Sequence, residues 1–265
     1  GSGLDVASGL ARRGKDVAVV EPGRLGGTCL NRGCIPSKML IHRADVVQTI
    51  RGSERFGIDA EISGIDFEKI VEEVNKEVHG DSGRIEKGLE ESDNHSLYRE
   101  EARFIDENIL ELKDSEEKIK ADKIVIAAGS RPLIPPVDGR EETDYWVSSD
   151  ALDPDRKPDE LIIIGGGYVS LEMAHFYDAM GTSITIVERE ERLLSREDRD
   201  IAEKITELAR ERYEVLLEVS AREVYEEKGR KKVVLDDKEH DQELEADEVM
   251  FATGRVPNTD SLQVE

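Results

Sequence analysis

A strand–glycine–helix–strand pattern near the middle of the 265-residue chain constrains its fold more than any other feature. Residues 161–164 are an apolar run typical of a short buried strand, and three glycines follow at 165–167. A helix is predicted over 171–180, and a second apolar strand over 184–187 ends at Glu188. Such glycines let the backbone approach a pyrophosphate at a helix N-terminus, and an acid about twenty residues later accepts hydrogen bonds from a ribose. The order of elements predicts a parallel α/β unit that binds a dinucleotide.

The third glycine position of this turn is occupied by Ser170. A serine side chain is small enough to allow the close packing of helix on strand that this position requires. Ser170 and Glu188 are eighteen residues apart, close to the spacing expected between the turn and the ribose-binding acid. We therefore predict that Gly165, Gly167, Val169, Ser170 and Glu188 contact the cofactor.

The first residues of the chain carry half of the same pattern. Gly1 and Gly3 precede a predicted helix over 4–13, and an apolar strand over 17–20 ends at Glu21. We interpret this stretch as the second part of a strand–helix–strand unit whose first strand is missing. A glycine turn before a helix is also common without a bound nucleotide, so the half-pattern alone leaves a purely structural role open.

A second repeated phrase supports a duplication. Residues 124–132 and residues 249–258 each contain an apolar run that ends in small residues and continues with Gly, Arg and Pro. A strand is predicted at the start of both phrases. The repetition indicates two related nucleotide-binding units.

The remaining segments fit this organisation. Helix formers with apolar residues at helical spacing dominate 39–91, and 97–120 is strand-rich. We predict an α/β protein with two Rossmann-like folds, each with a small β meander, in domains over 1–142 and 143–265.

Composition excludes several function classes. The chain has 61 acidic and 37 basic side chains, and its net charge of −24 repels nucleic-acid phosphates and anionic lipid surfaces. It contains no apolar run of membrane-spanning length and no signal peptide at its start, so a cytoplasmic location is expected. The acidic residues are spread along the chain, which favours adaptation to a salt-rich cytoplasm over an ordinary solvated surface.

Both cysteines of the chain, Cys29 and Cys34, lie in one short segment with Pro36 just beyond them. Proline suits the first turn of a helix, whose positive end favours a thiolate. A zinc site is disfavoured because the five histidines are scattered without ligand spacing. Two inert buried thiols are the other alternative. A redox-active pair is the favoured interpretation.

Residues 26–38 resemble the redox-active signature of the class I pyridine nucleotide–disulfide oxidoreductases, and the similarity extends over essentially the whole chain. The resemblance implies FAD in the first fold and NAD(P)H in the second. Family members pass a hydride from nicotinamide to FAD, then two electrons to a protein disulfide, and then to an external disulfide. The full-length protein is expected to be a homodimer.

The resemblance also implies individual roles. Cys29 matches the interchange thiol that meets the substrate, and Cys34 matches the thiol in charge-transfer contact with the flavin. Lys38 matches a lysine near the flavin and Glu172 its carboxylate partner, although a surface lysine and a helix-start glutamate are ordinary alternatives. Tyr168 matches a position over the nicotinamide pocket, or is a packed aromatic. Further cofactor contacts are expected from Gly1, Gly3, Glu21, Gly27, Thr28, Lys38, Ala128, Gly129, Arg131, Arg189, Gly254 and Arg255.

The chain departs from the family pattern at its end. Complete members continue into a dimerisation domain whose His-Glu pair serves the partner subunit's thiols, whereas this sequence stops at Glu265. We expect a fragment with weakened FAD retention and little activity of its own. His42 is interpreted as a helix-surface residue and not as a substitute base.

Cofactor and substrate preferences follow from the same comparison. Glu188 is expected to bind the NAD ribose and to repel the 2′-phosphate of NADP, although Arg189 and Arg196 leave NADP possible. The cysteine segment is most similar to dihydrolipoamide dehydrogenases, whose partner is a lipoyl domain. A mycothione, glutathione or mercuric reductase is the alternative, and a non-catalytic FAD-binding scaffold is the interpretation from a different class.

Overall fold

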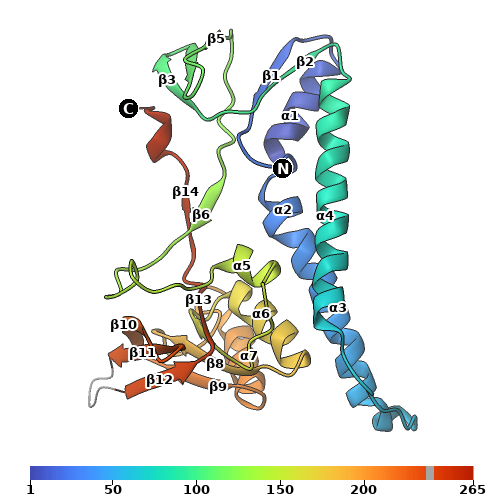
Figure 1. Cartoon of the computed structure of the whole chain (residues 1–265), viewed down its shortest axis with the longest axis vertical. Helices are drawn as coiled ribbons and strands as arrows, with labels where there is room; N and C mark the ends of the chain where they lie inside the picture. Colours follow the sequence, from blue (N-terminus) through green and yellow to red (C-terminus); the bar gives the residue numbers. More distant parts are fainter. Residues whose placement is uncertain (237–241, 265) are drawn as a thin grey trace. The chain divides into compact units, whose positions relative to one another are not determined.

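The computed structural model describes residues 1–236 and 242–264, and the chain divides into two compact units (Figure 1). The first unit comprises Gly1–Pro36, Asn75–Arg131 and the residues from Val256 on, and the second comprises Ser37–Val74 and Pro132–Arg255. Both units combine helices with strands, which confirms the predicted α/β class. Within the described residues, no helix is long and apolar enough to cross a membrane.

A parallel sheet of strand order β13–β7–β8–β9 forms the centre of the second unit. β7 lies between β8 and β13, so the apolar run at 161–164 is a central strand. All four of its residues are buried, as expected of a parallel strand that is covered on both faces. The strands are β7 (Glu160–Ile164), β8 (Ser183–Glu188), β9 (Glu214–Leu217) and β13 (Glu248–Phe251).

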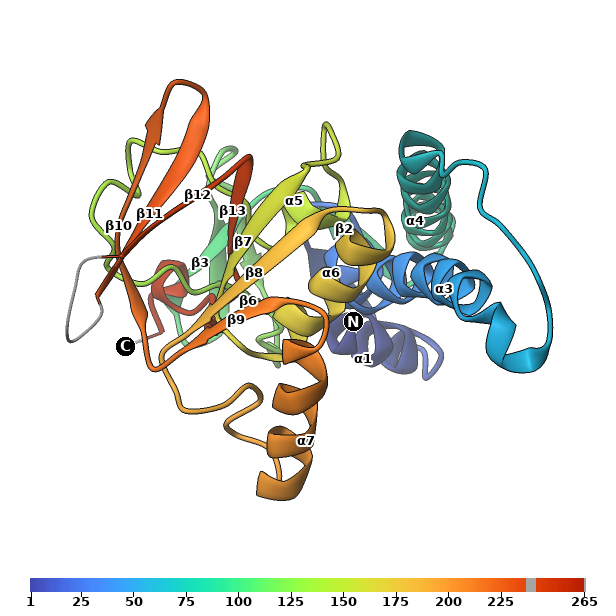
Figure 2. The same ribbon diagram turned by 90° about the horizontal axis from the view of Figure 1, so that it is seen from below.

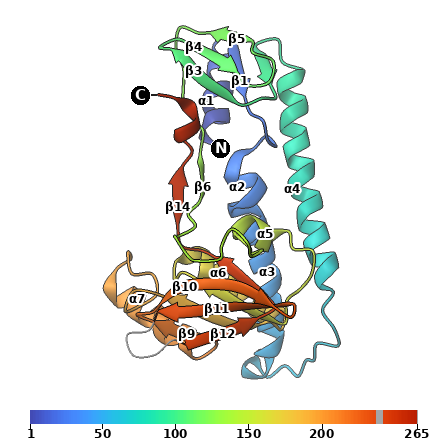
Figure 3. The same ribbon diagram turned by 60° about the vertical axis from the view of Figure 1, so that its left-hand side comes forward.

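Different layers cover the two faces of this sheet (Figures 2 and 3). On one face, Ile162 and Ile164 share an apolar cluster with Val233 and Leu235 of an antiparallel meander. Since neighbouring strand residues point to opposite faces, Ile163 points toward the other layer, where helix α6 contacts β7 and β8. The elements are β10 (Ser220–Glu227), β11 (Arg230–Asp236), β12 (Gln242–Ala246) and α6 (Tyr168–Ala179).

Phe67, the first residue of α4, packs with two aromatic residues of α6. The ring of Phe67 lies 5.9 Å from that of Phe176 and 6.1 Å from that of Tyr177, measured between centroids. Two long helices, α3 and α4, begin in one unit and end in the other. The helices are α3 (Cys34–Arg51), η1 (Ser53–Phe56), α4 (Phe67–Glu90), α5 (Ser148–Leu152) and α7 (Arg199–Arg210).

Two small sheets lie wholly within the described residues of the first unit. β1 pairs in parallel with β2, and β3, β4 and β5 form the antiparallel meander predicted over 97–120. Near the ends of the two repeated phrases, β6 pairs with β14. The elements are α1 (Ser2–Ala11), β1 (Val17–Val20), α2 (Gly27–Arg32), β2 (His95–Tyr98), β3 (Ala102–Asp106), β4 (Ile109–Leu112), β5 (Lys118–Lys120), β6 (Ser130–Pro132), β14 (Arg255–Pro257) and η2 (Asp260–Leu262).

The strand predicted at the start of the first repeated phrase is wrong. Residues 122–129 form no strand, and Val125 and Ile126 are 59% and 52% exposed. The matching residues of the second phrase form β13, which pairs with β7. Among the described residues of the first unit, the sheet that contains β1 has β2 as its only other strand. An apolar run becomes a strand only where a neighbour satisfies its backbone groups, and here the structure describes none.

The turn between β7 and α6 explains why α6 begins at Tyr168, three residues before the predicted start. Gly165 has φ +114°, and a Cβ placed on it would lie 2.5 Å from the carbonyl oxygen of Ala252. The chain therefore enters the helix directly after Gly167, which is the N-cap residue. Only a glycine at 165 allows β7, the turn and the end of β13 to approach so closely.

We expect Gly165→Ala to destabilise the protein by about 2 kcal/mol or more, because the alanine would combine a positive φ with a backbone clash. Gly167→Ala is the matched control: Gly167 has φ −83°, a Cβ there meets nothing within 4 Å, and the expected change is about 1 kcal/mol or less, from the poorer N-cap alone. Urea unfolding of both variants measures the difference. Equal destabilisation would contradict this account of the turn.

Candidate functional site

The two cysteines belong to the first unit and lie where α2 ends and α3 begins. Cys29 is on α2, and Cys34 is the first residue of α3, so Cys34 occupies the positive end of a long helix. Pro36 lies in the first turn of α3, as predicted. Gly33 separates the helices, and a Cβ on it would lie 2.9 Å from the Thr28 carbonyl oxygen. Glycine therefore permits the tight turn between the helices.

Neither cysteine is in a disulfide, and both are exposed. A side-chain hydrogen bond with Cys34, together with partial burial, raises the pKa of Cys29 above its ordinary value. The hydrogen bond therefore links the two thiol groups of the reduced pair. This arrangement suits a dithiol that can be oxidised to a disulfide, because the two sulfur atoms are already within hydrogen-bonding reach.

Asn31 is a residue that sequence reasoning missed. Its side-chain nitrogen lies 2.9 Å from the Leu25 carbonyl oxygen and 3.2 Å from that of Gly27, and it contacts the Arg24 carbonyl oxygen as well. It therefore holds the loop that leads into α2 and Cys29. The asparagine between the two cysteines was the available signal, but its spacing alone does not reveal the carbonyl groups that it reaches.

One turn beyond Cys34 along α3, Lys38 forms an ion pair with Glu172 of α6, with Nζ and Oε1 2.5 Å apart. Both residues belong to the second unit. The lysine side chain is 60% exposed and the glutamate 28%. The sequence prediction named these residues as partners, and the structure brings them together. His42 lies exposed on the same helix.

Several of the residues predicted to contact FAD in the first unit are glycines at which backbone segments approach each other. The backbone nitrogen of Gly1 donates to the Gly26 carbonyl oxygen at 2.8 Å, and a Cβ on Gly27 would lie 3.5 Å from that nitrogen. A Cβ on Gly3 would lie 2.8 Å from Cβ of Ala127. The chain segments thus approach closely at these glycines. Thr28 is the second residue of α2, next to Gly27.

Glu21 follows β1, as the ribose-binding prediction requires. Its Oε1 accepts a hydrogen bond from the Gly23 nitrogen at 2.9 Å, and its carbonyl oxygen accepts one from Arg99 at 3.2 Å. Arg99 also donates to the Gly23 carbonyl oxygen at 2.6 Å. The Glu21 carboxylate is held in place and keeps acceptor capacity for a hydroxyl group.

Hydrogen bonds from Asn258 join the two repeated phrases. Asn258 is a second residue that the sequence analysis did not predict. Its side-chain nitrogen donates to the Ala128 carbonyl oxygen at 2.9 Å, and its backbone nitrogen donates to that of Gly129 at 3.0 Å. The guanidinium of Arg131 contacts Asp260, with Nη2 and Oδ2 2.9 Å apart. Arg131, predicted to contact a cofactor, is therefore engaged by protein groups.

Gly254 and Arg255, the other predicted cofactor residues of the second repeated phrase, lie just before Asn258 in the sequence. Gly254 has φ +122°, and its carbonyl oxygen accepts a hydrogen bond from the Leu133 nitrogen at 2.9 Å. Arg255 opens β14 and is half-buried. Both residues lie in the second unit, at its boundary in sequence with the first.

In the second unit, Glu188 reaches back to the glycine turn. Its Oε2 accepts a hydrogen bond from the Gly166 nitrogen at 2.5 Å, and its Oε1 accepts one from the Glu190 nitrogen at 2.9 Å. Both contacts orient the carboxylate at the end of β8. Arg189 is 73% exposed and pairs with Glu190, with Nε and Oε1 3.2 Å apart.

The first residues of α6 differ sharply in exposure. Tyr168 is 64% exposed, Val169 is half-buried and Ser170 is fully buried. In the described chain the Oγ atom of Ser170 has no hydrogen-bond partner, so this small side chain acts by fitting against its neighbours. The exposed Tyr168 ring is not the packed aromatic of the alternative interpretation.

These residues fit the cofactors that the sequence resemblance implies. In the second unit, the empty space where a Cβ of Gly167 would point is suited to a pyrophosphate, and the oriented Glu188 carboxylate is suited to ribose hydroxyls. In the first unit, the close approach of Gly1 and Gly27 leaves backbone exposed without side chains, as a bound diphosphate requires.

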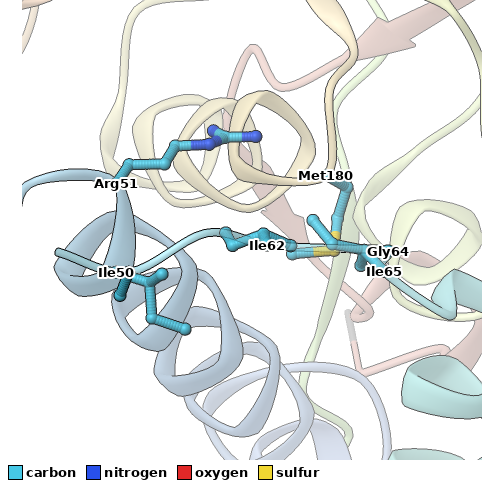
Figure 4. A pocket seen from close by; sticks show the side chains of 7 residues that line it. Ile50, Arg51, Ile62, Gly64, Ile65 and Met180 are labelled. Carbon is cyan, nitrogen blue, oxygen red and sulfur yellow. The ribbon is translucent and has the colours of Figure 1, made fainter.

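A pocket of about 470 Å³ lies elsewhere in the second unit (Figure 4). Among the lining residues Arg51 alone has a polar side chain, and none of the predicted cofactor or catalytic residues contributes to the pocket. The lining residues are Ile50, Arg51, Ala60, Ile62, Gly64, Ile65 and Met180.

The sequence is similar to several known reductases and dehydrogenases. The chain is 35% identical over 255 residues to a mycothione reductase of Mycobacterium tuberculosis, covering 95% of this chain and 55% of that protein. It is 33% identical to a dihydrolipoyl dehydrogenase of Staphylococcus aureus, with 99% and 56% covered, and 31% identical to a mercuric reductase of Staphylococcus aureus, with 100% and 48% covered. The chain spans about half the length of these relatives.

A solved structure agrees with the sequence relatives. The HOCl-induced flavoprotein disulfide reductase RclA from Escherichia coli superposes with a TM-score of 0.84 at 29% identity, covering 98% of this chain and 55% of that one. The sequence profile of the family described as pyridine nucleotide-disulphide oxidoreductase matches residues 1–265. The resemblance drawn from residues 26–38 is thereby confirmed. The chain belongs to the pyridine nucleotide-disulphide oxidoreductase family.

Proposed function

We propose that this chain is the nucleotide-binding and dithiol-bearing part of an enzyme that passes electrons between NAD(H) and a disulfide or dithiol substrate. The observation that carries the proposal is the hydrogen-bonded pair Cys29 and Cys34 at the start of α3, on the helix that also bears Lys38. A scaffold that only binds nucleotides would not need two adjoining thiols at a helix terminus.

The dithiol chemistry follows from the two sulfur positions. The thiolate of Cys29 attacks an external disulfide, forms a mixed disulfide and releases one substrate thiolate. Cys34 then attacks the Cys29 sulfur, forms the internal disulfide and releases the second thiolate. The two protons of the cysteines end on the two substrate thiols. The substrate gains two electrons and the cysteine pair loses two.

The cofactors would be held by the groups described above. Gly1, Gly27 and Glu21 would contact FAD, while Gly167 and Glu188 would contact the nicotinamide nucleotide. The flavin supplies two-electron transfer between nicotinamide and the cysteine pair. The residues named above would orient the flavin. Lys38 lies on α3, the helix that begins with Cys34, and its ion pair with Glu172 holds the lysine charge in place.

Several substrates fit this chemistry. Lipoamide remains the first candidate because of the cysteine segment, and low-molecular-weight disulfides such as mycothione are the second because of the 35% identical relative. Mercuric ion is the third, on the same ground of similarity. Turnover of all three by the complete protein, measured with NADH, would rank these candidates.

The charge-transfer role of Cys34 can be tested by colour. Upon two-electron reduction, the FAD-loaded enzyme should develop a long-wavelength absorption band that disappears in Cys34→Ser. Cys29→Ser has no disulfide to reduce, so its Cys34 thiolate should give the band beside oxidised flavin before any reduction, while disulfide turnover is lost. Absence of the band from the unmodified enzyme would support the non-catalytic scaffold instead.

The effect of the hydrogen bond between the thiols can be tested by alkylation. Because the hydrogen bond with Cys34 raises the pKa of Cys29, Cys34→Ala should lower that pKa toward its ordinary value. The pH midpoint for iodoacetamide labelling of reduced Cys29 should therefore shift to lower pH. Ile35→Ala, which changes an exposed neighbouring side chain, is the control and should leave the midpoint in place. A Cys34→Ala midpoint that does not move would refute this effect of the Cys34 hydrogen bond.

We further propose that NADH is preferred over NADPH, because the Glu188 carboxylate repels a 2′-phosphate. Glu188→Gln keeps an oxygen that can accept from Gly166 but removes the charge, and should reduce the preference for NADH about tenfold. Glu203→Gln removes an exposed carboxylate of α7 and serves as the control. The ratio of kcat/KM values for the two nucleotides is the measurement, and an unchanged ratio in Glu188→Gln would argue against this role.

A further inference from the structure

A polar network joins α3 to α6 beyond the Lys38–Glu172 pair. His175 Nε2 lies 2.8 Å from Asp45 Oδ1, and His175 Nδ1 lies 3.2 Å from Arg212 Nη1. Arg212 also bonds to Asp178, whose Oδ2 accepts from Gln48 Nε2 at 3.2 Å. We call Asp45, Gln48, His175, Asp178 and Arg212 the α3–α6 network; all belong to the second unit.

The chemistry of the partners fixes the proton on His175. A guanidinium only donates hydrogen bonds, so Nδ1 of His175 must accept from Arg212. The ring proton is then on Nε2, which donates to the Asp45 carboxylate. Arg212 is held by Asp178 and by the ring of Tyr213, 5.1 Å from its guanidinium carbon. His175 therefore bridges a cation and an anion as a neutral ring.

The network shares its helix faces with the Lys38–Glu172 pair. On α6, His175 follows Glu172 by three residues, and on α3, Asp45 follows Lys38 by seven. Both spacings place the residues along one side of each helix. Besides the Gln48–Asp178 hydrogen bond further along α3, the His175–Asp45 contact joins the two helices closer in sequence to Lys38 and Glu172. A second contact on the same sides fixes the register at which Lys38 meets Glu172.

We infer that His175 is a positioning residue for the Lys38–Glu172 pair: by bridging Asp45 and Arg212 it fixes the register of α3 against α6. The inference rests on the proposed function, in which this pair lies near the flavin. His175 itself touches none of the reacting atoms. Its effect on flavin chemistry passes through Glu172.

The test is a double-mutant cycle in the FAD-loaded enzyme. His175→Ala should slow flavin reduction by NADH about tenfold. In a Glu172→Gln background, where the pair is already lost, the same change should have less than about a twofold effect. The reduction potential of the bound flavin is the second readout and should shift on His175→Ala only when Glu172 is present. Equal effects in both backgrounds would overturn the inference.

Two substitutions at Asp45 keep the test valid if His175→Ala fails to fold. In Asp45→Asn the amide oxygen still accepts from Nε2–H, so reduction kinetics should stay near those of the unmodified enzyme. Asp45→Ala removes the acceptor and should behave as His175→Ala. His79→Ala, at an exposed histidine of α4, is the control. Identical kinetics of Asp45→Asn and Asp45→Ala would contradict the role of this contact.

A measurement independent of activity checks the tautomer. ¹⁵N chemical shifts of the His175 ring at neutral pH should show Nδ1 unprotonated and Nε2 protonated, and Asp45→Ala should shift the Nε2 signal. A protonated Nδ1 would refute the bridging arrangement. Loss of the charge-transfer band in the unmodified enzyme would instead refute the proposed function, so the two failures are distinguishable.

Discussion

The parallel pairing of β7 with β8 on one side and β13 on the other is the constraint on which the second unit depends. It buries residues 161–164 on both faces and brings the ends of three strands to one edge of the sheet. The glycine turn, Glu188 and the end of β13 meet there because parallel strands all end on the same side. The left-handed Gly165 backbone, pressed against the Ala252 carbonyl group, is the local condition for that meeting.

Helix α3 connects the chemistry to this framework. Its first residue is Cys34, Lys38 lies one turn later, and Asp45 lies two turns further along the chain. Lys38 contacts Glu172 of α6, and Asp45 contacts His175 of the same helix. Helix α6 in turn begins at the glycine turn. Within the second unit, α3 and α6 therefore bring the lysine–glutamate pair together. The exposed ion pair contributes little stability by itself, so its value lies in where it places charge.

Some basic side chains of the second unit each form ion pairs with more than one acidic side chain. Arg230 of β11 bonds to Glu160, Glu245 and Asp247, so it ties β11 to both β12 and β7. Hydrogen bonds from Lys232 and Arg230 lower the pKa of Glu245. With 61 acidic and 37 basic side chains, each basic group can serve several carboxylates. The meander is thus attached to the sheet by charge at its edge and by Val233 and Leu235 in its core.

The sequence by itself determined the α/β class, the central strand at 161–164, the glycine turn and the cysteine pair. These features depend on local properties: apolar runs, glycine backbone freedom, and the chemistry of two nearby thiols. Only the tertiary structure decided that residues 122–129 form no strand, because an extended run needs a pairing partner that local composition does not supply. It also revealed the contacts of Asn31, Asn258 and His175, which join groups distant in sequence or buried in a turn. No spacing rule could identify them, since their partners are carbonyl and carboxylate oxygens that only the folded chain brings within hydrogen-bonding reach.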